Sequence, residues 1–238
     1  MASSILVSGK LGDLIHSMYV ANHLKVRHGI DSNIYITEVV EPFENGVHNT
    51  YKELKPIIRQ QHGNNGFFIW EGQPIEYNTT KFRESPLLYR KCWTEIMATT
   101  FFPNEEPVSG AWMKYNEVRN WDTTLVINRR YKNPMSQHIK SAYLHQIQQH
   151  ENVIFLGSKH DYDLFPLKDY CKLVVPFDMS DWFTHIAKCK TFFGNQSAPL
   201  AIASALNTPR IAELLPLPHP DWAHYHGEEK YGEIICIQ

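Results

Sequence analysis

In the first half of the chain, short runs of apolar residues alternate with amphipathic stretches. An apolar run at residues 4–8 ends at Gly9, and an amphipathic stretch from Asp13 to His28 leads to a second run at 33–40. Short apolar runs bounded by turn residues predict buried strands, and three- to four-residue spacing predicts helices. The start is therefore β-α-β, followed by a helix at 49–61, a strand at 66–70, a polar loop at 71–85 and a helix at 86–102.

The same rhythm returns in the second half. Between residues 102 and 122 the pattern loosens around prolines and a glycine, which predicts a linker. Strands are predicted at 123–128, 152–156, 173–175, 192–193 and 208–212, and helices at 136–150, 181–188 and 199–206. Alternating strands and helices predict an α/β fold. We predict two Rossmann-like domains, residues 1–118 and 119–238, facing each other across a ligand cleft. A single six- or seven-stranded sheet is the alternative.

Composition and charge narrow the class of protein. The 238 residues carry a net charge of −2, which gives no electrostatic footprint for nucleic acid. The four cysteines show no CxxC spacing, and no apolar run reaches the length of a membrane span. The first residues lack the charged region and long apolar core of a signal peptide. We expect a soluble cytoplasmic protein without a transmembrane segment.

One stretch, residues 192–199, predicts a binding site for phosphate. Gly194 and Asn195 are expected to supply a turn, and Ser197 is a good N-cap. Pro199 suits the first turn of a helix, and residues 200–206 are apolar on nearly every side, as in a buried helix. The N-terminus of that helix would direct unpaired N–H groups at a ligand above the turn.

This stretch resembles the nucleotide-sugar signature of the family 9 glycosyltransferases, the heptosyltransferase-like enzymes of bacterial lipopolysaccharide assembly. Their pattern runs approximately Gly-Asn-Asp-Ser-Gly-Pro-x-His-Leu-Ala-x-Ala-Leu-x-x-Pro. The residues that match are Gly194, Asn195, Ser197, Pro199, Ala203, Ala205, Leu206 and Pro209. Gln196, Ala198 and Ala201 depart from it, at positions expected to face the ligand. The resemblance implies a compact, divergent member with the GT-B fold, two Rossmann-like domains with an interdomain cleft.

A second motif, Gly9-Lys10-Leu11-Gly12-Asp13, ends the first strand. Gly9 and Gly12 allow a turn close to a ligand, with Lys10 between them, and Asp13 stands at the mouth of a helix. A carboxylate there gains about 0.3–1 kcal/mol from the helix dipole, which is a purely structural explanation. Family 9 enzymes open with a strand and a Gly-Asp turn, so the resemblance implies that Asp13 is the general base. The same dipole is expected to weaken its basicity.

The loop after the first strand of the second half carries Asn128, Arg129, Arg130 and Lys132. Ligands bind at the carboxyl ends of strands in open α/β sheets, and guanidinium groups suit diphosphate oxygens. A solvated basic loop is the structural alternative. We expect Arg130 and Lys132 on the donor phosphates, with Arg129 less certain. The resemblance implies further donor contacts from Asn128, Gly157, Phe177, Met179, Asn195, Gln196, Ser197 and Ala198, with Gly9, Lys10, Gly12 and Gly194 as turn or supporting residues.

Taken together with these residues, the resemblance implies an inverting glycosyltransferase without a metal or other cofactor. It would move a sugar from a nucleotide-diphosphate donor to a hydroxyl of a glycan acceptor, with the loops at 43–49 and 71–85 on the acceptor side. A catalytically silent nucleotide- or sugar-binding module is the alternative. An NAD(P)-binding oxidoreductase would use Glu38, but residues 9–12 supply only part of its glycine motif. His219, His224 and His226 lack the spacing of a metal site.

Overall fold

The computed structural model describes residues 2–87, 91–115, 123–131, 134–213 and 234–237. Its strands form two separate sheets in which every pair is parallel. The first sheet has the order β3 (Asn64–Ile69), β2 (Ser32–Thr37), β1 (Ser3–Ser8) and β4 (Tyr77–Asn78). The second has the order β10 (Ile234–Ile237), β9 (Arg210–Glu213), β8 (Thr191–Asn195), β5 (Leu125–Asn128), β6 (Val153–Leu156) and β7 (Lys172–Val174). The two-sheet prediction is confirmed, and the single-sheet alternative is wrong.

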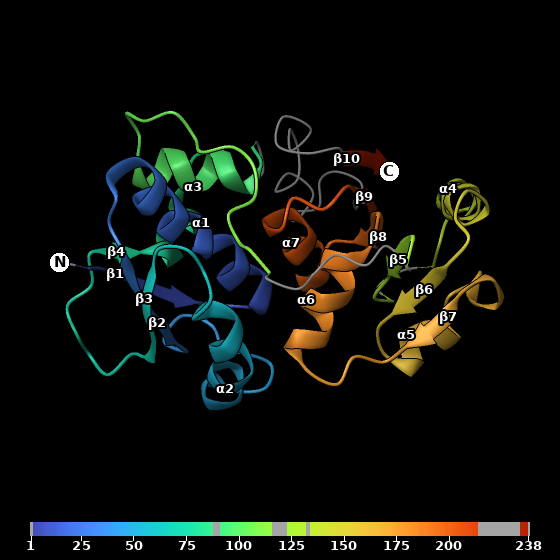
Figure 1. Cartoon of the computed structure of the whole chain (residues 1–238), viewed down its shortest axis with the longest axis horizontal. Helices are drawn as coiled ribbons and strands as arrows, with labels where there is room; N and C mark the ends of the chain where they lie inside the picture. Colours follow the sequence, from blue (N-terminus) through green and yellow to red (C-terminus); the bar gives the residue numbers. More distant parts are fainter. Residues whose placement is uncertain (1, 88–90, 116–122, 132–133, 214–233, 238) are drawn as a thin grey trace.

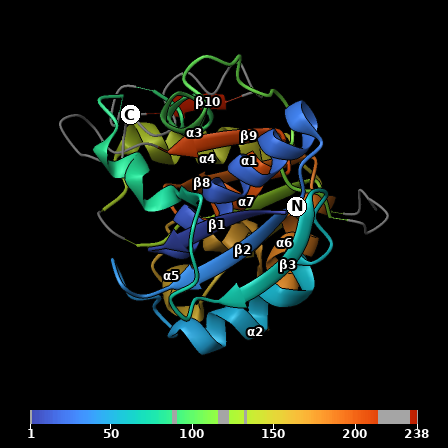
Figure 2. The ribbon, with the colours of Figure 1, turned by 90° about the vertical axis from the view of Figure 1, so that its left-hand side faces the viewer.

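Helices cover these sheets and fill the space between them. Figure 1 shows α1, α6 and α7 between the two sheets and α4 beyond the second sheet, while Figure 2 shows β1, β2 and β3 side by side. The α-helices are α1 (Leu11–His28), α2 (Val47–Ile58), α3 (Trp93–Phe101), α4 (Gln137–Gln148), α5 (Lys159–Asp163), α6 (Met179–Lys188) and α7 (Ala198–Ala205). Short 3₁₀ helices are η1 (Thr79–Glu84) and η2 (Lys168–Tyr170). None of the helices in the described ranges could cross a membrane.

The two sheets share a hydrophobic core because α1 packs directly against α7. One cluster of buried side chains runs from Ile5 in β1 through Ile15 in α1 to Ile202 in α7 and Val126 in β5. The two helices meet at Gly12 and Ala201, where a Cβ built on Gly12 would lie in ordinary van der Waals contact, 3.9 Å from Ala201 Cβ. A second cluster lies on the other face of the second sheet, under α4. The shared cluster holds the ends of α1 and α7 in a fixed relation.

Residues 102–115, called here the connecting segment, are tightly held. The Val108 N–H donates to the Tyr19 hydroxyl at 2.7 Å, and the Trp112 N–H donates to the Ala205 carbonyl at 3.0 Å. Gln61 accepts from the Lys114 N–H at 2.7 Å and donates to its carbonyl at 3.0 Å. The described part of the linker predicted at 102–122 does connect the two sheets without helix or strand, and these hydrogen bonds hold it in place. The predicted domain boundary at 118/119 lies outside the described residues.

Several element bounds differ from the sequence prediction for local reasons. The second strand ends at Thr37, because the Ser8 hydroxyl accepts from the Val40 and Glu41 N–H groups and turns the chain. The helix predicted from 86 begins only at Trp93. The loop predicted at 71–85 contains β4 and η1, and Asn78 caps η1 by accepting from the Thr80 N–H at 3.1 Å.

Gly194 and Asn195 do not form the predicted turn. Both lie within β8, and neither has a positive φ. Gly194 is needed because a Cβ there would lie 2.5 Å from the Asn128 carbonyl oxygen on the neighbouring β5. The requirement is therefore the close approach of two strands.

Candidate active site

A cavity of about 630 Å³ opens where the N-termini of α1, α6 and α7 converge. Its walls also include the loop after β2, one side of α2, and the segments that follow β5 and β8. The carboxyl ends of parallel strands are where open α/β sheets bind ligands. The lining residues are Lys10, Leu11, Gly12, Asp13, His16, Pro42, Phe43, Glu44, Asn45, Thr50, Glu53, Leu54, Trp93, Arg130, Met179, Gln196, Ser197 and Ala198.

Asp13 lies in the first turn of α1, with 17% of its side chain exposed. Its Oδ2 accepts from the Lys10 N–H at 3.1 Å and from Arg83 Nη2 at 2.6 Å. Within the described ranges, these side-chain hydrogen bonds all reach Oδ2, which leaves Oδ1 for a ligand. Gly9 has φ of +123°, and a Cβ there would lie 2.5 Å from Oδ2. The glycine thus makes room for the Asp13–Arg83 pair.

The charges around Asp13 oppose one another. Arg83 also lies 3.3 Å from Glu41, and Lys10 Nζ lies 3.5 Å from the same carboxylate. Burial raises the pKa of Asp13 above its ordinary value; Arg83 and the Lys10 N–H lower it, and Glu41 adds to the rise. The net direction is a raised pKa, opposite to the effect expected from the helix dipole alone, because desolvation outweighs the favourable charges.

Asn195 and Asn128 support the cavity wall across from Asp13, which includes Arg130 and Ser197. Asn195 forms two hydrogen bonds with the backbone of Arg130. Asn195 Oδ1 accepts from the Arg130 N–H at 3.1 Å, and Asn195 Nδ2 donates to the Arg130 carbonyl at 2.7 Å. Asn128 donates to the Leu156 carbonyl at 2.8 Å. Neither asparagine lines the cavity, so the structure places both as supports behind the wall. The Arg130 side chain does line it, is 60% exposed, and lies 3.4 Å from Glu44.

Ser197 occupies the N-cap position of α7 without capping it. Its hydroxyl lies 3.1 Å from Asn128 Oδ1 and 2.9 Å from the Asn195 carbonyl oxygen. The predicted capping hydrogen bond is therefore wrong. The helix start has no side-chain cap, and Gln196, Ser197 and Ala198 at this start line the cavity.

Besides the two asparagines, four further residues expected at the ligand do not line the cavity. Phe177 is 94% exposed, and Gly157 packs against Phe155 and Asn128. Arg129 is buried in a forked ion pair with Glu213, at 2.8 and 2.9 Å, so it is not available for phosphate. Ala201 is fully buried beside α1. Met179 lines the cavity as expected, while Lys132 lies outside the described residues.

The cavity is not strongly cationic. Among its described lining residues, the basic side chains Lys10 and Arg130 are outnumbered by three acidic ones, Asp13, Glu44 and Glu53. Lys10 is partnered by Glu41, and Arg130 by Glu44. An anionic ligand there would depend on the start of α7 and on Arg130 leaving Glu44.

Sequence reasoning missed several residues around Asp13. Arg83 appeared only as part of a polar loop, and Glu41 had no signal at all. His16 stacks on Trp93 with ring centroids 4.5 Å apart, and both line the cavity. His16 follows Asp13 by three positions, which places both on one face of α1 and was a usable signal.

Metal-type side chains gather elsewhere in the described part of the chain. His23, His28 and Glu105 lie together near the C-terminal end of α1. His219, His224 and His226 lie outside the described residues. The candidate active site is therefore built from carboxylate, guanidinium and backbone groups.

Comparison with known proteins gives fold likeness without sequence likeness. No family model matches the chain, and no curated protein matches it. E. coli heptosyltransferase WaaC with ADP aligns over 100% of this chain and 94% of its own, with 10% identity and a TM-score of 0.60. E. coli ADP-heptose heptosyltransferase II aligns over 100% and 90%, with 13% identity and a TM-score of 0.60.

A family 9 glycosyltransferase from Veillonella parvula aligns over 99% of this chain and 85% of its own, with 13% identity and a TM-score of 0.59. These identities are low, so the comparisons establish the fold. The chain has the α/β, Rossmann-like fold of the heptosyltransferases and of a family 9 glycosyltransferase, as the sequence resemblance implied.

Proposed function

We propose that the chain is an inverting glycosyltransferase of the GT-B type and that the cavity is its interdomain cleft. One observation carries the proposal: a single cavity joins Asp13 on one wall to the uncapped start of α7 and Arg130 on the other. A transferase needs an acid–base group and a leaving-group site that face the same reacting carbon.

The donor in this proposal is a nucleoside diphosphate sugar. The N–H groups at the start of α7 and the Arg130 guanidinium are suitable partners for two linked phosphoryl groups. Gln196 and Ala198 would approach the phosphates through their backbone. WaaC has been solved with ADP and with ADP-2-deoxy-2-fluoro heptose, which makes ADP the first nucleotide to try.

In the proposed reaction, Asp13 Oδ1 takes the proton of an acceptor hydroxyl. The hydroxyl oxygen forms a bond to the anomeric carbon while the bond from that carbon to the diphosphate oxygen breaks. The diphosphate leaves toward Arg130 and α7, which neutralise its charge without a metal ion. Attack from the Asp13 side, opposite the leaving group, inverts the anomeric centre. The raised pKa of Asp13 increases its affinity for the transferred proton.

Replacing the base separates binding from chemistry. We expect Asp13→Asn to keep the affinity for the nucleoside diphosphate and to lower kcat by about 10²–10⁴-fold, the usual contribution of general-base catalysis. The measurement is donor turnover on glycan acceptors, after a thermal-shift screen with ADP, UDP, GDP and dTDP. Wild-type turnover in Asp13→Asn would remove Asp13 from the mechanism.

A silent binding module is the second candidate function. Gln196 and Ala198 line the cavity in place of the family's acid and glycine, and Arg83 already occupies one oxygen of Asp13. This candidate predicts specific binding of one diphosphate with no transfer to any acceptor and no hydrolysis of the donor.

The oxidoreductase alternative has less support. The Glu38 carboxylate accepts from the Phe43 N–H at 3.3 Å and so helps to fold the loop after β2. Gly9 makes room for the Asp13–Arg83 pair. Stabilisation by NAD(P) and not by nucleoside diphosphates would favour this alternative.

The cytoplasmic location expected from the sequence stays a prediction.

A further inference from the structure

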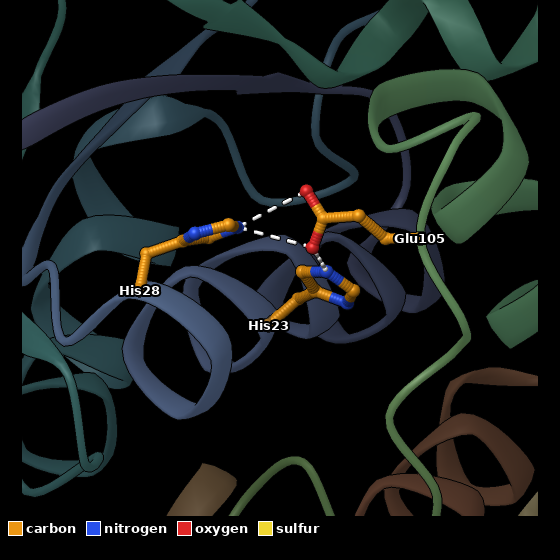
Figure 3. Close-up of side chains that lie close together, drawn as sticks. All are labelled: His23, His28 and Glu105. Atoms are coloured by element: carbon orange, nitrogen blue, oxygen red, sulfur yellow. Dashed lines mark hydrogen bonds and ion pairs between the residues drawn. The ribbon is translucent and has the colours of Figure 1, made fainter.

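A cluster of three potential metal ligands lies far from the candidate active site. His23 and His28 belong to the C-terminal part of α1, and Glu105 comes from the connecting segment (Figure 3). His23 follows Asp13 by ten positions, which is about 15 Å along a helix that rises about 1.5 Å per residue. The cluster is therefore a feature separate from the proposed reaction.

The side chains already converge on one point. Glu105 Oε2 lies 2.9 Å from His23 Nε2 and 3.1 Å from His28 Nε2, and Glu105 Oε1 lies 3.1 Å from His28 Nε2. His23 is fully buried and stacks on Phe102 with ring centroids 3.9 Å apart, which fixes its ring plane. His23 and His28 lie 82 and 77 positions from Glu105 in the sequence, so only the folded chain brings the three side chains together.

These distances are close to those of a tetrahedral metal site. Bonds of about 2.0–2.2 Å to nitrogen and oxygen place tetrahedral ligand atoms about 3.3–3.5 Å apart. The Glu105 oxygen therefore needs to move only about 0.5 Å from each ring nitrogen to admit an ion, and the three ligand atoms all lie within 4.8 Å of one another. Glu105 and His28 are partly exposed, so this adjustment is open to them.

One side of the cluster is open to an incoming ion, because His28 and Glu105 are partly exposed. A cavity of about 300 Å³ beside His28 and Glu105 gives an entry path and room for a water molecule as the fourth ligand.

One feature limits the affinity. His23 Nδ1 is buried and has no hydrogen-bond partner among the described residues. Metal-bound histidines usually donate their second ring N–H to an acceptor, and losing that acceptor typically weakens metal affinity about 10–100-fold. We therefore expect micromolar binding in place of the tighter binding of closed structural zinc sites.

We propose that His23, His28 and Glu105 form a binding site for a divalent transition metal, Zn²⁺ above all. Two imidazoles and one carboxylate are ligands that zinc accepts, with a water molecule in the open position. The ion would join the connecting segment to α1 and so fasten the segment that runs between the two sheets. Its role is structural, and the proposed glycosyl transfer does not pass through it.

The test uses the full chain with any histidine tag removed, after treatment with EDTA and desalting. Titration calorimetry with Zn²⁺ is run on wild type, His28→Gln, Glu105→Gln and His138→Gln. His138 is an exposed histidine on α4 and serves as the control. We expect both site variants to lose one Zn²⁺ per chain, or to bind it at least tenfold more weakly, and the control to match wild type.

A second readout separates ligation from folding. Zn²⁺ should raise the melting temperature of wild type and His138→Gln, and leave that of the two site variants unchanged. His28 is 39% exposed, so His28→Gln carries the test even where Glu105→Gln fails to fold. Identical Zn²⁺ binding in wild type and His28→Gln, or no binding by wild type, would overturn the proposal.

Discussion

At the scale of single residues, the protonation of Asp13 depends on two neighbours of opposite charge. Arg83 lowers the pKa of Asp13 and Glu41 raises it, while burial dominates both. A general base must be ionised, so activity should fall as the pH decreases through this pKa. Because burial has raised that pKa, the acidic limb of the kcat/KM profile should lie above the range of an ordinary aspartate.

Neutralising Arg83 or Glu41 should move the acidic limb of the kcat/KM profile in opposite directions. Arg83→Gln removes a positive charge 2.6 Å from Oδ2, so the pKa of Asp13 rises and the limb moves to higher pH. Glu41→Gln removes a negative charge, so the limb moves to lower pH. The measurement is kcat/KM against pH for the three proteins. Limbs that coincide in all three would show that Asp13 does not set the profile.

Arg130 and Glu44 form a matched pair for testing the donor site. Arg130→Gln should weaken binding of a nucleoside diphosphate by about 10–100-fold, the loss of a hydrogen bond to a charged group. Glu44→Gln should leave binding equal or up to about fivefold tighter, because Arg130 no longer has a competing exposed partner. Calorimetric titration with ADP measures both. Equal weakening by the two substitutions would argue against a phosphate at Arg130.

The sequence revealed these residues unevenly. The glycine turn before Asp13 and the segment at 194–198 were visible because each is a local pattern. Arg83 and Glu41 were not, since they lie 70 and 28 positions from Asp13 and no local pattern marks a long-range ion pair. The role of Gly194 was misjudged because a glycine does not show whether it is needed for φ or for space.

At the scale of elements, the β-α rhythm was predictable and the packing of the connecting segment was not. Apolar runs and helical spacing carry information about strands and helices. The connecting segment is held through backbone groups of Val108 and Trp112, which any residue except proline possesses. The sequence therefore predicted a linker but not the contacts that hold it.

A buried ion pair lies at the carboxyl ends of β5 and β9, and the cost of disrupting it can be measured. Arg129 and Glu213 are 5% and 6% exposed, and Tyr143 donates to Glu213 at 3.1 Å. Glu213→Gln removes the carboxylate charge that is paired with the buried guanidinium and should lower the free energy of unfolding by about 3–5 kcal/mol. Urea denaturation measures this loss.

A double substitution supplies the control for that experiment. Arg129→Met with Glu213→Leu removes both charges and should cost much less than Glu213→Gln alone, since buried pairs replaced by apolar residues are often neutral. A double variant as unstable as the single one would mean that the pair contributes through packing and not through charge.

At the scale of the whole molecule, the two sheets and the shared core bring three helix N-termini to one cavity. The two-sheet arrangement followed from the repeated rhythm of the sequence. The contact between α1 and α7 did not, because it joins residues such as Gly12 and Ala201 that are far apart in the sequence. That contact sets the separation between Asp13 and the start of α7 that the proposed transfer requires.

The most direct test of this account is a crystal structure of the chain with the nucleoside diphosphate that stabilises it best. The account predicts electron density for the two phosphoryl groups against the backbone of residues 196–198 and the Arg130 side chain, with the terminal phosphate facing Asp13. Density for the nucleotide outside the cavity, or phosphates that leave Arg130 paired with Glu44, would contradict it.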